Sequence, residues 1–302
     1  MTESIDWDVD FEEFSDSTQN NEQIEFARKR FGGLGASQIH AICTYQPDTA
    51  QLPKLESELS SYLQRLEEKS CLGFWEADFK SDDIEMELKA KGAITIYRNA
   101  ESTQKKIDAI NTDSLPDGAL ELAEKIALER LTGFCEESDV SFDTPATRWG
   151  NKYEAEAIEA LKAEYPEYDF LFTGEEQKSF QLLDYQHEWA TPDAVASIAG
   201  YRAATVDSKC PYNRRVHFRN WRLITGRESF KKMHPVYYWQ GVDQMLATEL
   251  KAFWFVSYDP RCIDTKIPAL VVHKFELYQP DADFLLSRVA MFEDEVARIM
   301  EC

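Results

Sequence analysis

The sequence has few cysteines, and none of them stands in the short pairs that bind metal clusters. The six are scattered over 302 residues as Cys43, Cys71, Cys135, Cys210, Cys262 and Cys302. The absence of a Cys-x-x-Cys pair disfavours a structural zinc site and an iron–sulfur cluster. The same scatter offers no disulfide framework, so we expect the chain to work in a reducing compartment.

Long apolar runs are missing as well. No stretch reaches the roughly 18 consecutive apolar residues of a membrane-spanning helix. The N-terminus is acidic, whereas a secretory signal peptide begins with basic residues and continues with an apolar segment. These two absences predict a protein of the cytoplasm.

Basic residues are the third scarcity, because 33 Lys and Arg face 55 Asp and Glu, which gives a net charge of −22. This excess argues against a nucleic-acid partner for the chain as a whole. The charges are unevenly distributed, however. Residues 1–25 hold nine carboxylates and no Lys or Arg, whereas residues 210–232 hold seven Lys or Arg and one acid. A basic strip of this kind can still bind a phosphate backbone.

The remaining composition is that of a folded protein, with 43% hydrophobic and 13% aromatic residues. We expect residues 1–22 to form an acidic tail without stable structure; the alternative is a docking segment or a guard over the basic strip. Residues 23–302 are expected to form a single domain that carries an insertion at about residues 46–117.

Hydrophobic spacing predicts both helices and strands. In the insertion it predicts a helix over 55–66 and strands at 84–88 and 93–97, which makes the insertion an α+β elaboration. The other expected helices cover residues 24–30, 36–43, 149–165, 235–250 and 281–300, and a further helix is capped by Asp117 and ends before Gly133. The other expected strands cover residues 168–173, 182–193, 201–209, 252–258 and 267–276, with a turn over 197–200.

Two acids and a lysine stand in a suggestive order around that turn: Asp193, then Asp207 and Lys209. Side chains alternate along a strand, so Asp207 and Lys209 share one face. If the flanking strands pair as a hairpin, Asp193 lies beside Asp207. Two carboxylates with a lysine suit a hard divalent cation, which can activate water and neutralise a phosphate. Asp-x-Lys alone is more typical of a solvated strand, and the preceding Asp193 brings the two interpretations into balance.

Other polar residues at helical positions are weaker candidates. Glu154 lies early in the helix expected over 149–165, where most glutamates are solvated. Tyr237 and Gln240 are three residues apart and share a helix face, where aromatic residues usually belong to the core. Ser37 lies near a helix start with Arg30 upstream, an arrangement that can bind an anion but is also typical of an ordinary helix end.

The order of these elements resembles the PD-(D/E)xK nuclease superfamily: a helix with a Glu, a strand ending in Pro-Asp, a strand ending in Asp-x-Lys, and a helix with a Gln. With the flanking residues, the chain is similar to the YqaJ-type viral recombinase family, the lambda-exonuclease type of nuclease. The matching stretches are Arg30-Phe31-Gly32 to Ala36-Ser37, Trp149-Gly150 with Tyr153-Glu154, Thr191-Pro192-Asp193, Asp207-Ser208-Lys209-Cys210-Pro211, and Tyr237 and Gln240 through Tyr258-Asp259-Pro260-Arg261. The resemblance implies a restriction-endonuclease-like core, in which helices flank a central mixed β-sheet.

The resemblance also implies a role for each matching residue. Asp193 and Asp207 would bind Mg²⁺ directly, together with the backbone carbonyl of Ser208. Glu154 would hold a second ion or a metal-bound water, and Mn²⁺ would substitute for Mg²⁺. Lys209 would orient or deprotonate the attacking water, or stabilise charge on the phosphate.

Further positions would complete the site and bind DNA. Gln240 would hold Lys209 or the water in place, and Tyr237 would line the site. The 5′-phosphate and DNA contacts would come from Arg30, Ser37, Arg215, Arg219 and Arg222.

The family activity implied is a 5′→3′ double-strand DNA exonuclease that releases 5′-mononucleotides and leaves 3′ single strands for recombination by strand annealing. Its implied partners are DNA ends with a 5′-phosphate, a phage single-strand annealing protein, and two further copies in a ring-shaped homotrimer, in the cytoplasm of a bacterial host. Two alternatives stay open: another PD-(D/E)xK DNA endonuclease, and a non-catalytic DNA-end-binding module.

The chain departs from the family pattern in three places. The acid before x-Lys is usually Glu, whereas Asp207 is one methylene shorter. The family's hydrophobic wedge falls on Thr147, which puts strand separation by that residue in doubt. Residues 46–117 replace a shorter, basic connection, so the family's loop contacts to DNA do not carry over.

Overall fold

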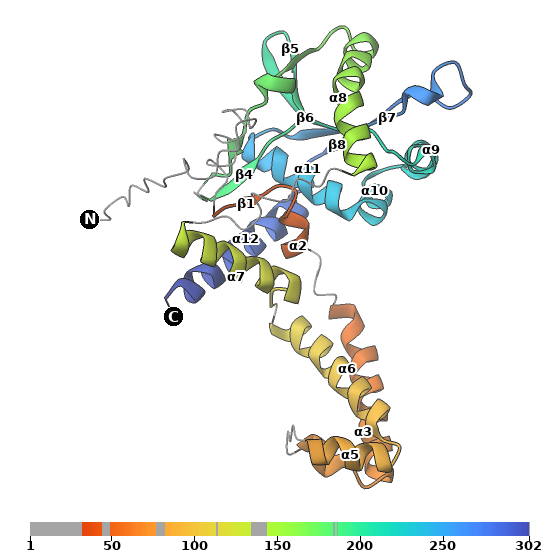
Figure 1. Ribbon diagram of the computed structural model, residues 1–302, viewed down its shortest axis with the longest axis vertical. Helices are drawn as coiled ribbons and strands as arrows, with labels where there is room; N and C mark the ends of the chain where they lie inside the picture. Colours follow the sequence, from red (N-terminus) through yellow and green to blue (C-terminus); the bar gives the residue numbers. More distant parts are fainter. Residues whose placement is uncertain are drawn as a thin grey trace. The chain divides into compact units, whose positions relative to one another are not determined.

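Figure 1 shows the computed structural model of the chain, which describes residues 32–43, 49–76, 82–112, 114–133, 144–183, 185 and 187–301. The expected acidic tail and the expected helix over 24–30, which includes Arg30, lie outside the described residues. The chain divides into two compact units, one made of Met1–Thr44 with Asp117–Cys302 and the other of Tyr45–Pro116. The second unit occupies the stretch that we interpreted as an insertion.

The larger unit contains a five-stranded mixed sheet with the strand order β2-β5-β6-β7-β8. Its strands are β2 (Asp169–Leu171), β5 (Ala194–Ile198), β6 (Tyr201–Lys209), β7 (Ala252–Tyr258) and β8 (Leu270–Glu276). The central pair β6 and β7 is parallel, and every other neighbouring pair in this sheet is antiparallel. A mixed sheet flanked by helices confirms the predicted fold class.

The long strand expected over 182–193 is wrong, because only Glu188–Ala190 of this stretch is a strand, and it belongs to a second, smaller sheet. The strands β1 (Leu34–Gly35), β3 (Phe180–Gln181) and β4 (Glu188–Ala190) form a small sheet in the order β1-β4-β3. Only after Asp193 does the chain enter β5, which pairs with β6 as a hairpin. The turn is shorter than expected, because Ala199 and Gly200 alone connect the strands with φ angles of 51° and 81°. Two left-handed residues suit a tight hairpin turn.

Two helices cover opposite faces of the five-stranded sheet (Figure 1). Helix α8 (Pro145–Glu164) packs Ile158 and Leu161 against a core that includes Trp254 of β7. Helix α11 (Pro235–Ala247) lies on the other face, where Gly241 meets the ring of Phe253. A Cβ atom on Gly241 would lie only 2.7 Å from the ring carbons of Phe253, so this close approach requires glycine.

The remaining helices of this unit are α2 (Ile39–Cys43), α7 (Asp117–Thr132), α9 (Arg214–Leu223), α10 (Arg227–Met233) and α12 (Gln279–Met300), with short 3-10 turns η3 (Gly174–Glu176) and η4 (Pro260–Cys262). Helices α7 and α12 lie side by side in Figure 1. They are joined by Arg130, whose two terminal nitrogens each lie 2.9 Å from a carboxylate oxygen of Glu293. None of the helices in the described part of the chain is long and apolar enough to cross a membrane.

The smaller unit is helical throughout its described residues, so the predicted α+β insertion is wrong. It consists of η2 (Thr49–Gln51), α3 (Leu52–Glu68), α4 (Leu72–Glu76), α5 (Asp82–Ala90) and α6 (Ile94–Thr112). The expected helix over 55–66 is confirmed as part of α3, but both expected strands are helical. The reason is packing: Leu88, Ile96 and Ala100 meet Leu66 in one core, and their spacing fits helices. Gly92, at φ 61°, ends α5 rather than turning a hairpin.

Candidate active site

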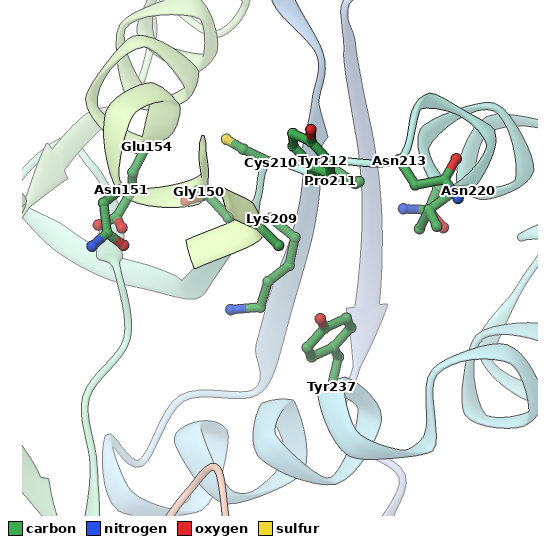
Figure 2. Close-up of a pocket in the computed structure, with 13 residues that line it drawn as sticks. Gly150, Asn151, Glu154, Lys209, Cys210, Pro211, Tyr212, Asn213, Asn220 and Tyr237 are labelled. Carbon is green, nitrogen blue, oxygen red and sulfur yellow. The ribbon is translucent and has the colours of Figure 1, made fainter. Parts of the chain in front are cut away.

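A cavity of about 510 Å³ opens where the C-terminal end of β6 meets α8, α9 and α11 (Figure 2). Its lining residues are Ala146, Gly150, Asn151, Glu154, Ser208, Lys209, Cys210, Pro211, Tyr212, Asn213, Val216, Asn220 and Tyr237. In Figure 2, Lys209 and Tyr237 point into the centre, and Asn151 and Glu154 face the same space from α8. Three of the predicted catalytic residues therefore share one cavity wall: Glu154, Lys209 and Tyr237.

The predicted pair of acids lies at the same end of β6. The main-chain N–H of Asp193 donates to the carbonyl of Val206 at 3.0 Å, which places Asp193 next to the strand position of Asp207. Oδ2 of Asp193 accepts hydrogen bonds from the main-chain N of Ser208 at 2.6 Å and from its hydroxyl at 3.0 Å. The expected closeness of Asp193 and Asp207 is therefore present, although the strand begins after Asp193 and does not end with it.

Asp207 is almost fully buried and is surrounded by donors. Lys209 points to the same side, as strand alternation predicts, and its Nζ lies 2.6 Å from Oδ2 of Asp207. Oδ1 accepts from Nε2 of Gln240 at 3.1 Å and from Nε2 of Gln244 at 3.3 Å. Gln240 thus bonds to Asp207, and the predicted contact between Gln240 and Lys209 is not found. The ring of Tyr237 lies beside the ammonium, with its centroid 5.2 Å from Nζ of Lys209.

The electrostatics of the site show that its carboxylates repel one another. Burial, followed by the charges of Asp207 and Glu154, raises the pKa of Asp193 to about 7 against the opposing effects of Lys209 and of the hydrogen bond from Ser208. Burial also raises the pKa of Glu154. Burial lowers the pKa of Lys209, but the charges of Asp207 and Asp193 outweigh it, so the net shift is upward. Three carboxylates and one ammonium leave an excess of negative charge that a divalent cation would neutralise.

The described residues can be tested for their fit to such a cation. No group of three or more His, Cys, Asp and Glu side chains among them is close enough to hold a metal ion. Mg²⁺ does not need three, because it commonly binds one or two carboxylates and keeps several waters. Asp193 and Asp207 are adjacent, mutually repelling oxygen donors, so the residues present fit Mg²⁺ as a two-carboxylate site. Glu154 instead accepts a hydrogen bond from Nε2 of Gln177 at 3.3 Å.

The residues predicted to contact DNA are spread over two places. Arg215, Arg219 and Arg222 are exposed on α9, whose N-terminal end lines the cavity through Asn213 and Val216. Asn213 caps α9 by accepting a hydrogen bond from the main-chain N of Arg215 at 3.0 Å.

Of the other predicted DNA contacts, Ser37 does not line the cavity. Ser37 is exposed in a turn, and the predicted helix start at Ala36 is wrong because α2 begins at Ile39. Arg30 lies outside the described residues. Thr147 is engaged in the first turn of α8, where its main-chain N donates to the hydroxyl of Thr144 at 3.1 Å.

Two features of the site were not anticipated from the sequence. Gln244 lies one helical turn after Gln240 and reaches the same oxygen of Asp207; its spacing on an otherwise apolar helix face could have indicated it. Arg261 contacts both carboxylate oxygens of Asp259, at 2.7 and 2.9 Å, and its guanidinium lies 4.2 Å from the ring centroid of Trp149. Arg261 belongs to the matching stretch Tyr258-Asp259-Pro260-Arg261, but the sequence analysis assigned no role to it.

A second polar cluster lies beneath α9, and we call it the histidine network: His217, Asn220, His234 and Ser257. Nε2 of His217 lies 2.8 Å from the carbonyl of Pro268, which can only accept, so this nitrogen donates. Nδ1 of His217 then accepts from the hydroxyl of Ser257 at 2.9 Å. Ser257 accepts from the amide of Asn220 at 3.0 Å, and Oδ1 of Asn220 accepts from Nε2 of His234 at 2.7 Å. One arrangement of hydrogens satisfies the whole chain.

Comparisons with known proteins give a likeness in fold. No known protein-family pattern matches the chain, and no curated protein matches it in sequence. Among solved structures, it is similar to an alkaline exonuclease (LHK-Exo) from Laribacter hongkongensis, with a TM-score of 0.48 and 20% identity over 62% of this chain and 84% of that chain. It is also similar to a phage related exonuclease from Haemophilus somnus 129PT, with a TM-score of 0.47 and 14% identity over 64% of this chain and 87% of that one. At this level of likeness, any assignment of activity rests on the site itself.

Proposed function

We propose that this protein is a Mg²⁺-dependent deoxyribonuclease that digests double-stranded DNA as an exonuclease, from 5′ ends towards 3′. It would release 5′-mononucleotides and leave 3′ single strands. The observation that carries the proposal is the half-buried Asp193 next to the buried Asp207 beside an open cavity, with the ammonium of Lys209 at 2.6 Å from Asp207. A carboxyl group such as that of Asp193, whose pKa is raised by burial and by a neighbouring charge beside a cavity, is typical of a functional site.

The chain's own residues support hydrolysis of a phosphodiester. Asp193, Asp207 and the backbone carbonyl of Ser208 would hold one Mg²⁺, and Glu154 would hold a second through water, with Mn²⁺ as a substitute. When bound, the metal supplies Lewis-acid activation of water and neutralises phosphate charge. Lys209 has a raised pKa and stays protonated, which favours stabilising charge on a phosphate oxygen over taking a proton from water.

The glutamines and the tyrosine have positioning roles in this scheme. Gln240 and Gln244 both donate to Oδ1 of Asp207 and so fix the orientation of that carboxylate. Tyr237 lies against Lys209 and limits where its ammonium can move. Each of these contacts holds a charged group still before substrate arrives, which is how a preorganised site lowers a barrier.

The exposed arginines of α9 suit the phosphate backbone of DNA. Arg215, Arg219 and Arg222 lie on the helix that borders the cavity, within an otherwise acidic protein. A guanidinium pairs well with phosphate oxygens and is insensitive to base identity. The polarity of digestion would come from Arg30 and Ser37, which the family resemblance places at the terminal 5′-phosphate.

The wider setting is proposed from the same resemblance. The enzyme would act on DNA ends with a 5′-phosphate, and it would supply single strands to a phage annealing protein for homologous recombination. A ring-shaped homotrimer in the cytoplasm of a bacterial host would fit this role.

The test uses pure protein, Mg²⁺ and two DNA substrates. A linear duplex with 5′-phosphates should be digested to 5′-mononucleotides, and a covalently closed circle of the same sequence should stay intact. Cleavage of the circle would favour the endonuclease alternative. Binding of duplex ends with no product under Mg²⁺ or Mn²⁺ would favour the non-catalytic alternative.

Polarity needs a separate comparison. The rates on 5′-phosphorylated and 5′-hydroxyl duplexes are measured for the wild type and for Arg30→Ala. A charged hydrogen bond contributes about 1.5–3 kcal/mol, so the wild-type preference for phosphate should fall by roughly 10- to 150-fold in the variant. An equal loss on both substrates would make Arg30 a general contact.

A further inference from the structure

The cavity is larger than a phosphate and two metal ions need. Beyond Lys209 and Glu154 it continues along Tyr212, Asn213 and Val216, which belong to the loop after β6 and to the start of α9 (Figure 2). Pockets of about 300–1,000 Å³ hold whole small molecules. At about 510 Å³, this cavity has room for the sugar and base attached to the phosphate.

Gly150 gives the first sign that a ligand passes along α8. It lies inside the helix, where glycine is less favourable than alanine. No neighbouring atom requires it, because a Cβ built on Gly150 would meet nothing within 4 Å. Gly150 lines the cavity, so the space that its missing side chain leaves is cavity space.

Tyr212 gives the second sign, because it is an exposed aromatic residue with a fixed position. Its side chain is part of the cavity wall, and the residue is 54% exposed. Its backbone carbonyl accepts a hydrogen bond from Nη2 of Arg261 at 3.1 Å, as does the carbonyl of Pro211 at 3.2 Å. The ring of Trp149 meets the ring of Tyr212 edge-on, with a centroid distance of 6.0 Å. Arg261 thus holds the backbone at Tyr212, and Trp149 contacts the ring of Tyr212 edge-on while the residue stays largely exposed.

We propose that Tyr212 and Gly150 form a nucleobase subsite, in which Tyr212 stacks on a base of the bound strand and the gap at Gly150 lets its nucleotide lie close to α8. This inference rests on the proposed function and adds a contact to the base. Stacking on an aromatic ring tolerates any base, since every base has a π-face, and it contributes roughly a 5- to 150-fold gain in affinity per base. The subsite would therefore hold nucleotides without selecting among them.

The test measures binding, so it does not depend on cleavage. Isothermal titration calorimetry compares dTMP, dAMP and 2-deoxyribose 5-phosphate on the whole protein without metal. The wild type should bind both nucleotides with similar affinity, and about 5- to 150-fold more tightly than the sugar phosphate. Tyr212→Ala should remove this preference, and Tyr212→Phe should keep it. Tyr201→Ala is the matched control, because Tyr201 is 79% exposed on β6 and does not line the cavity.

Gly150→Ala tests the second wall. It should raise Tm, because alanine is the better helix former, and should still weaken nucleotide binding. Gly118→Ala is its control: Gly118 is also helical with nothing within 4 Å, lies on α7, and should raise Tm with binding unchanged.

Two results would overturn the subsite. The first is that Tyr212→Ala keeps the same ratio of nucleotide affinity to sugar-phosphate affinity as the wild type. The second is that the wild type binds all three ligands equally. If the protein fails to cleave DNA but the preference for nucleotides is present, the nuclease proposal falls and the subsite stands. If cleavage is found and the preference is missing, the subsite falls alone.

Discussion

Two buried polar clusters lie in the same unit of this protein, and they are built in opposite ways. In the histidine network, each donor has an acceptor, and the chain of hydrogen bonds ends at the carbonyl of Pro268. In the acid cluster, burial and then the charge of Asp207 raise the pKa of Asp193 to about 7. A satisfied network makes a structure rigid, whereas an unresolved excess of charge costs stability unless a ligand neutralises it.

The difference assigns a task to each cluster. The histidine network joins α9 to β7 and to His234, the residue just before α11, so it holds the basic helix against the sheet. Glu154 and Lys209 at the acid cluster face the cavity. Changes in the acid cluster should therefore affect chemistry, and changes in the histidine network should affect stability.

The largest expected effect is the loss of cleavage in Asp207→Asn. A metal-held phosphate is stabilised by several kcal/mol, so the rate should fall by more than about 10³-fold while DNA binding persists. The measurement is single-turnover digestion of a 5′-phosphorylated duplex in Mg²⁺. Asp169→Asn is the control, because Asp169 is exposed on β2. A rate within tenfold of the wild type would show that the acid cluster is not the catalytic centre.

The next effect concerns pH and Asp193. Its pKa in the folded protein, about 7, is above the ordinary value of 3.8, so its contribution to stability is present below pH 4 and is lost as pH rises towards 7. The loss is of the order of a few kcal/mol. Without metal, Asp193→Asn should be more stable than the wild type at pH 8 and should show less change in Tm between pH 4 and 8. Parallel Tm curves for the two proteins would contradict the raised pKa of Asp193.

Ser257→Ala should break the histidine network. In contrast to Asp207→Asn, it should lower stability and leave cleavage nearly unchanged. It leaves Nδ1 of His217 and the amide of Asn220 without their buried partner, which should reduce the free energy of unfolding by about 1–3 kcal/mol. Cleavage well below Tm should change less than about threefold, because the hydroxyl of Ser257 bonds to His217 and Asn220, and the backbone pairing of Ser257 with Lys209 is kept in the variant. Denaturant unfolding measures the change in the free energy of unfolding. Ser287→Ala, at an exposed position of α12, is the control. A large loss of rate with normal stability would give the network a catalytic role.

The smallest expected effect lies on the outer face of α9, above the network. Each phosphate contact adds about 0.9 to the slope of log affinity against log salt concentration. Arg219→Gln should therefore lower that slope by about 0.9, with little preference among DNA sequences and little effect on stability. An unchanged slope would mean that α9 does not follow the phosphate backbone.

The acid cluster was accessible from the sequence, and the histidine network was not. Asp207 and Lys209 are two residues apart on one strand, so local alternation places them on one side. His217 and Ser257 are 40 residues apart on a helix and a strand, and their meeting depends on how α9 packs on β7. The prediction that Asp193 lies beside Asp207 holds although the strand before Asp193 was predicted wrongly. The reason is that the hairpin of β5 and β6, which follows Asp193, brings the two residues together.

The prediction of strands in the insertion was wrong for a related reason. Ile84, Met86 and Leu88 alternate like a strand, but Ile84 and Leu88 also fit a helical spacing. Contact with Leu66 decides between the two periods, and Leu66 lies outside the local window. The start of α2 was misplaced by three residues, because hydrophobic spacing does not separate a turn from the first turn of a helix.

Gly241 sets the distance between α11 and the sheet, and this distance affects the whole acid cluster. The helix α11 rests on the ring of Phe253 with no side chain between them, so the thickness of one aromatic ring fixes the height of the helix above the sheet. Gln240 and Gln244 stand on either side of that contact, and both reach Asp207 from this height. A single methyl group at Gly241 would lift the helix and withdraw both amides together. The positions of both glutamine amides therefore depend on one distance, that between α11 and the sheet. Substitutions elsewhere in α11 should be tolerated as long as this distance is kept.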